Sequence, residues 1–341
     1  MAAARAMGER AVTPRDAATI MLVRDAPTGG GGTGLQVCML KRHIDSDFVG
    51  GAYVFPGGKV DDADRDARAR SLCRGRDDAE ASELLGISSG GLAFFVAAIR
   101  ECFEESGVLL GYRGAAAGDG RDPAPAGGHA SREVAGAQEQ RRGFSDAGSL
   151  EWLAARRKEL NAGETDFVSL CNAGGITLAV DEVHYFSHWI TPEGAPKRYD
   201  TRFFVAAMAA GQTPAHDSYE TVDTAWVSPS EALERHKSGN FDLIFPTMKN
   251  LEAIGRFDTA GELLAAARAI EHVPAVLPRV VADGNGIRIL LPGDEGYDAS
   301  VAPAAGAAAV SDIGGGAATP AMSASEMDRV SRRIGLDGRS H

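Results

Sequence analysis

Cysteine is scarce in this sequence, and its four residues are Cys38, Cys73, Cys102 and Cys171. They show neither the paired spacing of a zinc site nor a secreted disulfide framework, so we expect reduced, buried thiols. No segment is long and continuous enough for a membrane span, and residues 1–13 contain no apolar core of signal-peptide length. Residues 338–341 are not a peroxisomal address of the Ser-Lys-Leu type. We therefore expect a soluble, cytoplasmic protein.

Positive charge is also in short supply. Lysine and arginine number 35 against 47 aspartates and glutamates, which gives a formal net charge of -12 and a pI near 5.2. An acidic surface repels nucleic-acid phosphates and anionic membranes, so we expect neither as a partner. A small phosphorylated substrate stays compatible, because a metal and local cations can bind it. Hydrophobic residues make up 44% of the 341 residues, which is enough for a substantial core.

The most informative stretch is a predicted helix at residues 92–106. It contains helix-forming residues without proline, and Gly107 suits its end because glycine tolerates positive φ. At about 100° per residue, Glu101, Glu104 and Glu105 fall within one arc, opposite a set of apolar residues. The helix is therefore expected to bury one face and to show three carboxylates on the other.

Like charges at this spacing repel one another unless something neutralises them. The usual agent is a hard divalent cation with oxygen ligands, and Mg²⁺ suits a partial carboxylate shell that also bridges to substrate phosphates. We therefore predict Mg²⁺ here, with Mn²⁺ as a substitute. Arg100 would fix the direction of a carboxylate without competing for the metal. The alternative interpretation is a solvated acidic face, which is what most charge runs are.

Two segments together resemble a known family signature. Residues 100–108 read RECFEESGV, and residues 58–64 read GKVDDAD, directly after FPG at residues 55–57. They resemble the second and first halves of the Nudix box, a loop, helix and loop that binds magnesium and cleaves a diphosphate linked to a nucleoside. Asp64 stands where the family pattern has glutamate. A long insertion, residues 65–99, separates halves that are normally a few residues apart.

The split box is typical of one Nudix branch, which contains the peroxisomal acyl-coenzyme A diphosphatases of animals. Further similarity to that branch lies at residues 198–204, 226–232 and 290–295, so that the resemblance runs from about Arg15 to Tyr297. It implies an α/β protein with the Nudix fold, an α/β/α sandwich around a mixed β-sheet.

The resemblance also implies the residues of a metal site. Glu101, Glu104 and Glu105 would bind the metal together with a backbone carbonyl at Gly58, and Arg100 would belong to the catalytic set. Some Nudix enzymes use an acid in the loop before a late strand as a further ligand or base, and Glu220 is the nearest match. Glu182 and Glu193 are weaker alternatives. A carboxylate would accept the proton of the water that attacks the diphosphate, and this role is left open between Glu101 and Glu220.

Substrate contacts are expected from Lys41, Arg42, Gly51, Phe55 and Gly57. Gly57 and Gly58 allow a close approach to a ligand that a Cβ would obstruct. Gly51 and the FPGG that follows match the end of a motif of coenzyme A-cleaving Nudix enzymes, although Asp47 occupies its arginine position. Lys41 and Arg42 would supply phosphate contacts.

The remaining pattern predicts one elaborated Nudix domain. We expect strands at residues 16–24, 35–41, 183–190 and 201–208, helices at 79–85 and 149–162, and a hairpin at 280–291. The expected divisions are a flexible N-terminus at 1–13, the Nudix domain at 14–240 with insertions about 65–91 and 111–148, a helical extension and hairpin at 241–299, and a disordered tail at 300–341. Residues 248–271, broken near Gly255 and Gly261, suggest a lid or the surface of a homodimer.

Three functions fit these observations. The first is hydrolysis of a phosphoanhydride in coenzyme A or acyl-coenzyme A, which the branch resemblance favours. The second is cleavage of another dinucleotide or nucleotide sugar, such as ADP-ribose or NADH. The third is non-catalytic nucleotide sensing, which is disfavoured because the carboxylates of the box are present.

Overall fold

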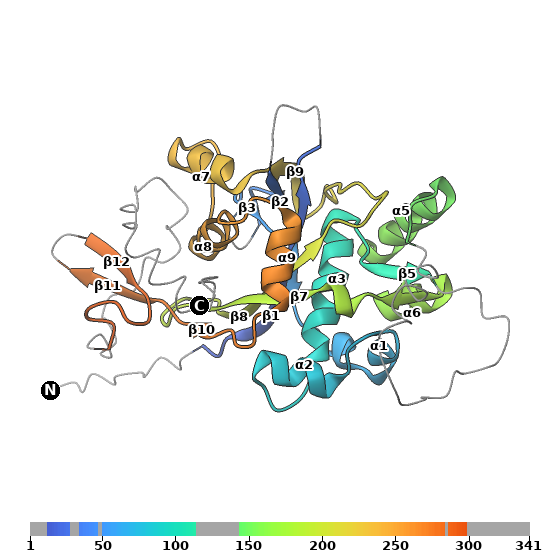
Figure 1. Cartoon of the computed structure of the whole chain (residues 1–341), viewed down its shortest axis with the longest axis horizontal. Helices are drawn as coiled ribbons and strands as arrows, with labels where there is room; N and C mark the ends of the chain where they lie inside the picture. Colours follow the sequence, from blue (N-terminus) through green and yellow to red (C-terminus); the bar gives the residue numbers. More distant parts are fainter. Residues whose placement is uncertain (1–11, 28–33, 47–49, 114–142, 284–285, 299–341) are drawn as a thin grey trace, which may run out of the picture.

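The structure is a computed structural model, and it describes residues 12–27, 34–46, 50–113, 143–283 and 286–298. Figure 1 shows a central sheet with α3, α5 and α6 on one side and α7 and α8 on the other. The expected N-terminal segment up to residue 11, most of the second insertion, the tail from residue 299, and Asp47 lie outside the described residues.

The sheet is mixed, as predicted. Its strands are β1 (Arg15–Asp25), β2 (Leu35–Arg42), β3 (Tyr53–Val54), β4 (Gly57–Lys59), β7 (His184–Ile190), β8 (Tyr199–Ala207), β9 (Thr221–Val227) and β10 (Ala275–Val276). Their order is β10-β7-β8-β1-β2-β3, with β4 paired to β1 and β9 paired to β2. β1 runs parallel to β8 and antiparallel to β2 and β4. Two short pairs lie outside this sheet, β5 (Gly111–Arg113) with β6 (Ile176–Leu178) and β11 (Arg279–Asp283) with β12 (Gly286–Leu290).

The apolar run of β1 explains why this strand lies inside the sheet. Successive side chains of a strand point to opposite faces, so a strand covered on both sides needs apolar residues at consecutive positions. Ile20 and Leu22 belong to one core cluster, and Met21 and Val23 belong to the other. The two clusters make the predicted α/β/α sandwich.

Helices cover both faces of the sheet (Figure 1). One layer contains α1 (Ala67–Ser71), α2 (Asp78–Leu85), α3 (Leu92–Ser106), α5 (Ala147–Asn161) and α6 (Phe167–Gly174), and the other contains α7 (Pro229–Lys237), α8 (Phe245–Ile254) and α9 (Ala260–Arg268). Two single turns, η1 (Asp62–Arg65) and η2 (Val180–Glu182), precede α1 and β7. Within the described residues, no helix combines the length and the apolar character needed to cross a membrane.

The region that was expected to be a lid or a dimer surface is part of the sandwich. Leu251 of α8 and Leu263 of α9 are fully buried in the second core cluster. The expected break at Gly261 is wrong, because α9 begins at Ala260. The hydroxyl of Thr259 accepts a hydrogen bond from the backbone N–H of Glu262, and this cap starts the helix ahead of the glycine.

α3 is buried along almost its whole length, and it begins and ends where the sequence predicted. Gly107 adopts φ 73° directly after its last residue. The expectation of an open acidic face is wrong, since Glu105 is only 4% exposed. The acids lie against β4 and the loop before β9 instead of facing bulk water.

The first insertion supports the N-terminus of α3. Its N-cap, Gly91, has no side chain with which to accept the free N–H groups of the first turn. Asp78, the first residue of α2, accepts hydrogen bonds from the N–H of Gly90 at 2.9 Å and of Leu92 at 3.1 Å. The hydroxyl of Ser82 accepts from the N–H of Gly91 at 2.9 Å. α2 therefore supplies the cap that α3 lacks.

We predict that Asp78→Ala lowers the free energy of unfolding by about 1–2 kcal/mol, because two backbone donors and the positive end of α3 lose their acceptor. Urea denaturation followed by circular dichroism measures the change. Glu83→Ala, at an exposed position of the same helix, is the control and should change stability by less than about 0.5 kcal/mol. Equal stability of the two variants would contradict the capping role.

Candidate active site

A buried arginine joins the two halves of the predicted box. Arg100 is 7% exposed, and its Nε and Nη2 donate to the two carboxylate oxygens of Asp64 at 2.9 Å each. Its Nη1 donates to Glu101 at 2.8 Å and to Glu104 at 2.9 Å. Its Nη2 also donates to the carbonyl of Lys59 at 2.9 Å. This network connects the two halves of the box across the long insertion, since Asp64 lies 36 positions before Arg100.

The network also fixes the charge of Arg100. Burial by itself lowers the pKa of the guanidinium, but the hydrogen bonds that it donates to Asp64 and the charges of Glu101 and Glu104 outweigh burial and raise the pKa. A bidentate guanidinium–carboxylate pair is among the stronger polar contacts in proteins. Arg100 therefore stays protonated and holds two of the predicted metal ligands.

The glycines of the box are in contact with the acids of α3. Gly57 and Gly58 lie in β4, a short strand paired with Thr19 and Ala18 of β1, where a loop was expected. The N–H of Gly57 donates to Glu105 at 3.0 Å. A Cβ at Gly58 would lie 2.5 Å from the carboxyl carbon of Glu101, closer than side chains approach. The absence of a side chain at Gly58 lets the Glu101 carboxylate pack directly on the strand.

Burial raises the pKa of all three glutamates. Burial raises the pKa of Glu101 to about 7; Arg100 opposes this shift and the charge of Glu104 adds to it. The pKa of Glu104 is raised by burial as well, again against Arg100. The pKa of Glu105 is raised well above its ordinary value, first by burial and then by the charge of Glu101. The cluster holds more negative charge than its surroundings stabilise.

This excess charge is what a hard divalent cation would balance, so the donor set suits Mg²⁺ or Mn²⁺. The site is not assembled in advance, however. Within the parts of the chain that the structure describes, no three acidic, histidine or cysteine side chains are grouped closely enough to hold a metal ion. The reason is visible in the contacts, because Arg100 holds Glu101 and Glu104 while the Gly57 amide holds Glu105. Each of these contacts uses one oxygen of its carboxylate, so a metal would bind through the second oxygen of each acid.

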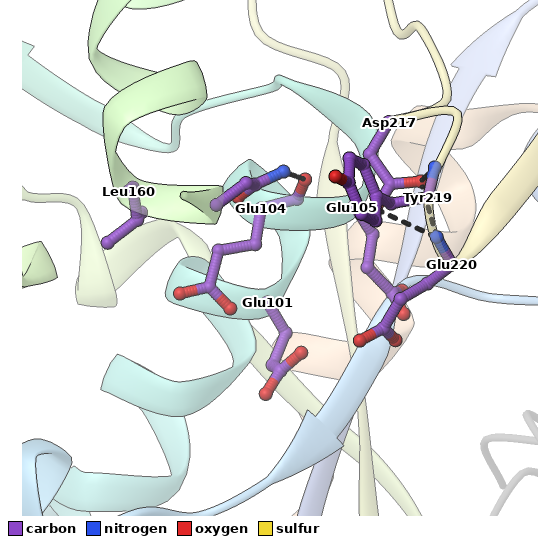
Figure 2. A pocket seen from close by; sticks show the side chains of 8 residues that line it. Glu101, Glu104, Glu105, Leu160, Asp217, Tyr219 and Glu220 are labelled. Carbon is purple, nitrogen blue, oxygen red and sulfur yellow. Dashed lines mark hydrogen bonds between the residues drawn. The ribbon is translucent and has the colours of Figure 1, made fainter. Parts of the chain in front are cut away.

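The three acids open into a pocket of about 260 Å³. Its lining residues are Glu101, Glu104, Glu105, Leu160, Asn161, Asp217, Tyr219 and Glu220. Figure 2 shows Glu101 and Glu104 on one side, and Glu105 beside the loop residues Asp217, Tyr219 and Glu220 on the other. The structure thus brings Glu220, a residue expected from sequence, to the α3 acids.

Arg42 is not among the lining residues, but its guanidinium lies near two acids that line the pocket. Its Nη1 is 4.0 Å from Glu105, and its Nη2 is 3.9 Å from Glu220. Both separations exceed hydrogen-bond length. Its Nε is buried and has no hydrogen-bond partner among the described residues. A guanidinium with donors left over beside a pocket is suited to an anionic ligand.

Three other predicted substrate residues lie elsewhere. Phe55 is 2% exposed in the second core cluster, so the expectation that it contacts substrate is wrong. Lys41 points its Nζ at the ring of Tyr53 at 5.6 Å, because the two residues pair directly across β2 and β3. Gly51 has φ 82° and its N–H donates to the carbonyl of Arg42, so it closes the β2–β3 turn.

The two weaker acidic alternatives are also outside the pocket lining. Glu182 pairs with Arg268 at 3.1 Å, and Glu193 is not among the lining residues. Two buried histidines of β7 also have partners within the protein. His184 accepts a hydrogen bond from Arg268 at 3.0 Å, and His188 pairs with Asp200.

Sequence reasoning missed two groups of residues around the acids. Arg157 of α5 donates through Nε to the carbonyl of Glu104 at 2.9 Å, and Asn161 donates to the same carbonyl at 3.1 Å. The sequence shows that Arg157 and Asn161 are one helical turn apart, but it does not show that both donate to the carbonyl of Glu104. Asp217 and Tyr219 also line the pocket, from a loop in which the sequence had predicted a role for Glu220 alone.

The mixed sandwich, the split box joined through Arg100 and the glycine strand packed on the acids together define a Nudix domain. The NUDT19 Nudix domain matches residues 75–254 of this chain. The acyl-coenzyme A diphosphatase NUDT19 of Gallus gallus is 30% identical over 317 residues, which cover 83% of this chain and 79% of that protein. The protein of the same name from Homo sapiens is 29% identical over 291 residues, or 77% and 72% of the two chains. The chain belongs to the NUDT19 Nudix family.

A solved structure supports the fold independently. The crystal structure of a NUDIX hydrolase from Alicyclobacillus acidocaldarius superposes with a TM-score of 0.52 at 22% identity, and the match covers 74% of this chain and 96% of that one. At this identity the likeness concerns the fold alone.

We predict that alanine has different effects at the two glycines of β4. A Cβ at Gly57 would lie 2.6 Å from the carbonyl oxygen of Ala18, which belongs to the backbone of β1 and cannot move aside. Gly57→Ala should therefore lower the free energy of unfolding by roughly 1–3 kcal/mol. Gly58→Ala meets only the end of the Glu101 side chain and should cost less stability, but displacing this carboxylate should weaken Mn²⁺ binding at least ~10-fold.

Urea denaturation and calorimetric titration with Mn²⁺ measure these two effects. Gly261→Ala in α9 is the control, because the nearest atom to its Cβ would be the Thr259 hydroxyl at 4.0 Å. It should be neutral or stabilising by about 0.5–1 kcal/mol and leave Mn²⁺ affinity unchanged. Wild-type Mn²⁺ affinity in Gly58→Ala would argue against Glu101 as a ligand.

Proposed function

We propose that this chain is a divalent-metal-dependent diphosphatase that hydrolyses the phosphoanhydride of coenzyme A or acyl-coenzyme A. The family supports the reaction class, and the names of the relatives from Gallus gallus and Homo sapiens support the substrate. The observation that carries the proposal is the pocket itself, in which acids of α3 and Glu220 face one another beside the guanidinium of Arg42.

The metal we propose is Mg²⁺, with Mn²⁺ able to replace it, held by Glu101, Glu104, Glu105 and the carbonyl of Gly58. When bound, it would supply charge neutralisation for the diphosphate and lower the pKa of a water molecule. The remaining tasks fall to the side chains of the protein.

Each residue has a task that its surroundings suit. Arg42 would bind a phosphate oxygen, since its Nη1 and Nη2 lie 4.0 Å and 3.9 Å from Glu105 and Glu220, two acids that line the pocket. Glu101 or Glu220 would accept the proton of the attacking water. Glu101 is suited to this by a pKa of about 7, which burial produces, and Glu220 by its exposed position across the pocket. Arg100 would keep the acids of α3 in place and would not touch the substrate.

The proposed reaction is hydrolysis of the phosphoanhydride bond of the substrate. Water adds to one phosphorus of the diphosphate and the bridging P–O bond breaks. The two products of acyl-coenzyme A are adenosine 3′,5′-bisphosphate and the acylated 4′-phosphopantetheine. We place this activity in the cytoplasm, which the four unpaired cysteines support because free thiols persist in a reducing compartment.

We predict that Glu104→Gln and Glu105→Gln each lower kcat at least roughly 100-fold, because each removes a charge from the proposed metal site while keeping the side-chain volume. Turnover of acyl-coenzyme A in Mg²⁺ measures the loss, and circular dichroism checks the fold. Glu182→Gln is the matched control outside the pocket and should keep full activity. Unchanged turnover in both pocket variants would remove the proposed metal site.

Metal removal and product analysis test the reaction itself. Chelation with EDTA should abolish hydrolysis, and added Mg²⁺ or Mn²⁺ should restore it. Mass spectrometry should find adenosine 3′,5′-bisphosphate and acylated 4′-phosphopantetheine as the products. Preferential cleavage of ADP-ribose or NADH in parallel assays would replace the proposed substrate with a dinucleotide or nucleotide sugar.

A further inference from the structure

An exposed aromatic ring stands at the pocket of the α3 acids. Tyr219 lines this pocket and is 84% exposed. Across the described residues, the exposed large hydrophobic side chains are Val12, Ile44, Tyr219 and Val222, so Tyr219 is the aromatic one among them. An aromatic side chain left in water beside a polar pocket forgoes the burial that usually stabilises it. Nothing in the proposed chemistry of the acids uses this ring.

The backbone beneath the ring is held in place. The carboxylate of Asp217 accepts hydrogen bonds from the N–H groups of Tyr219 at 3.0 Å, Glu220 at 3.1 Å and Thr221 at 2.8 Å. Figure 2 shows Asp217 beside Tyr219 and Glu220. Between Asp217 and Tyr219, Ser218 has φ 66°, a left-handed backbone conformation that a residue with a side chain rarely adopts. Such strain persists where the surrounding contacts enforce it, so the ring is presented from an ordered loop.

The loop is also tied to the helix that carries the acids. The N–H of Ala215 donates to the carbonyl of Ser106 at 2.8 Å. Arg157 donates to the carbonyl of Ala215 and to the carbonyl of Glu104, both at 2.9 Å. The backbone that carries the ring is therefore held in place relative to the acids of α3.

We propose that Tyr219 stacks on the nucleobase of the substrate. This inference rests on the proposed function, because it needs a nucleoside diphosphate linkage at the α3 acids. Every nucleobase offers a flat π face, and one exposed ring suffices to stack on it. An acyl chain needs a continuous apolar groove instead, and Leu160 is the one aliphatic residue in a lining otherwise made of polar side chains and Tyr219. The ring therefore selects nucleotides over other diphosphates.

Two ligands that differ only in the base test this assignment without turnover. AMP and ribose 5-phosphate share the sugar and the phosphate, and neither contains an anhydride to be cleaved. Calorimetric titration in Mg²⁺ should show that the wild-type protein binds AMP roughly 5- to 100-fold more tightly than ribose 5-phosphate, as expected for one stacked base. Tyr219→Ala should bind the two equally, while Tyr219→Phe and Tyr219→Trp should keep the preference.

Two outcomes would overturn the proposal. One is equal binding of AMP and ribose 5-phosphate by the wild-type protein, and the other is a preference for AMP that survives in Tyr219→Ala. Ile44→Ala is the control, since Ile44 is a 72% exposed apolar residue following His43, whose N–H donates to the carbonyl of Glu220. It should leave the preference for AMP unchanged, and an equal loss in Ile44→Ala would show that any apolar contact at the rim suffices.

Kinetics separate this inference from the proposed function. With acyl-coenzyme A as substrate, Tyr219→Ala should raise KM by the same roughly 5- to 100-fold and leave kcat within about twofold, because the ring binds the base and not the reacting phosphorus. A wild-type protein that binds AMP through Tyr219 but cleaves no nucleoside diphosphate would refute the function and keep the stacking site. If the wild-type protein cleaves acyl-coenzyme A and Tyr219→Ala leaves KM unchanged, the proposed function is kept and the stacking site is refuted.

Discussion

The guanidinium of Arg100 is the contact on which the site depends. A buried arginine is costly to desolvate unless its donors are all used, and here they reach Asp64, Glu101, Glu104 and the carbonyl of Lys59. The same contact joins the strand that carries Gly58 to the helix that carries the acids. The side chain of Asp64 is one carbon shorter than the glutamate of the family pattern, and it still accepts hydrogen bonds from Nε and Nη2 of Arg100. Lysine could not replace Arg100, because an ammonium cannot form the planar two-point pair.

Local patterns in the sequence predicted the central elements well. The consecutive apolar residues of β1 required a strand covered on both faces, and the ends of α3 were set by helix-forming residues and by Gly107. The arc of Glu101, Glu104 and Glu105 follows from helical periodicity alone. Their burial did not follow, because it depends on β4 and on the loop before β9, which come from distant parts of the chain.

What sequence could not reveal is mostly non-local. β4 contains two glycines, which disfavour a strand, and it forms because β1 offers it a partner. Asp78 lies one residue before the helix expected at residues 79–85, and nothing near it in sequence indicated its hydrogen bonds to the start of α3. Lys41 and Arg42 seemed equivalent as phosphate contacts, yet adjacent strand residues face opposite sides, and only Arg42 reaches the acids. Phe55 shared a motif with the glycines but packs into the core.

Both ends of α3 are anchored by elements that a shorter Nudix box would lack or place differently. α2 holds the first turn through Asp78 and Ser82, and α5 holds the last turn through Arg157 and Asn161. A helix restrained at both termini cannot slide or tilt to suit cations of different ionic radius. At the proposed metal site, a larger or smaller ion would have to be accommodated by rotation about the side-chain bonds of the glutamates, so selectivity among metals would depend on rotamers and not on backbone movement.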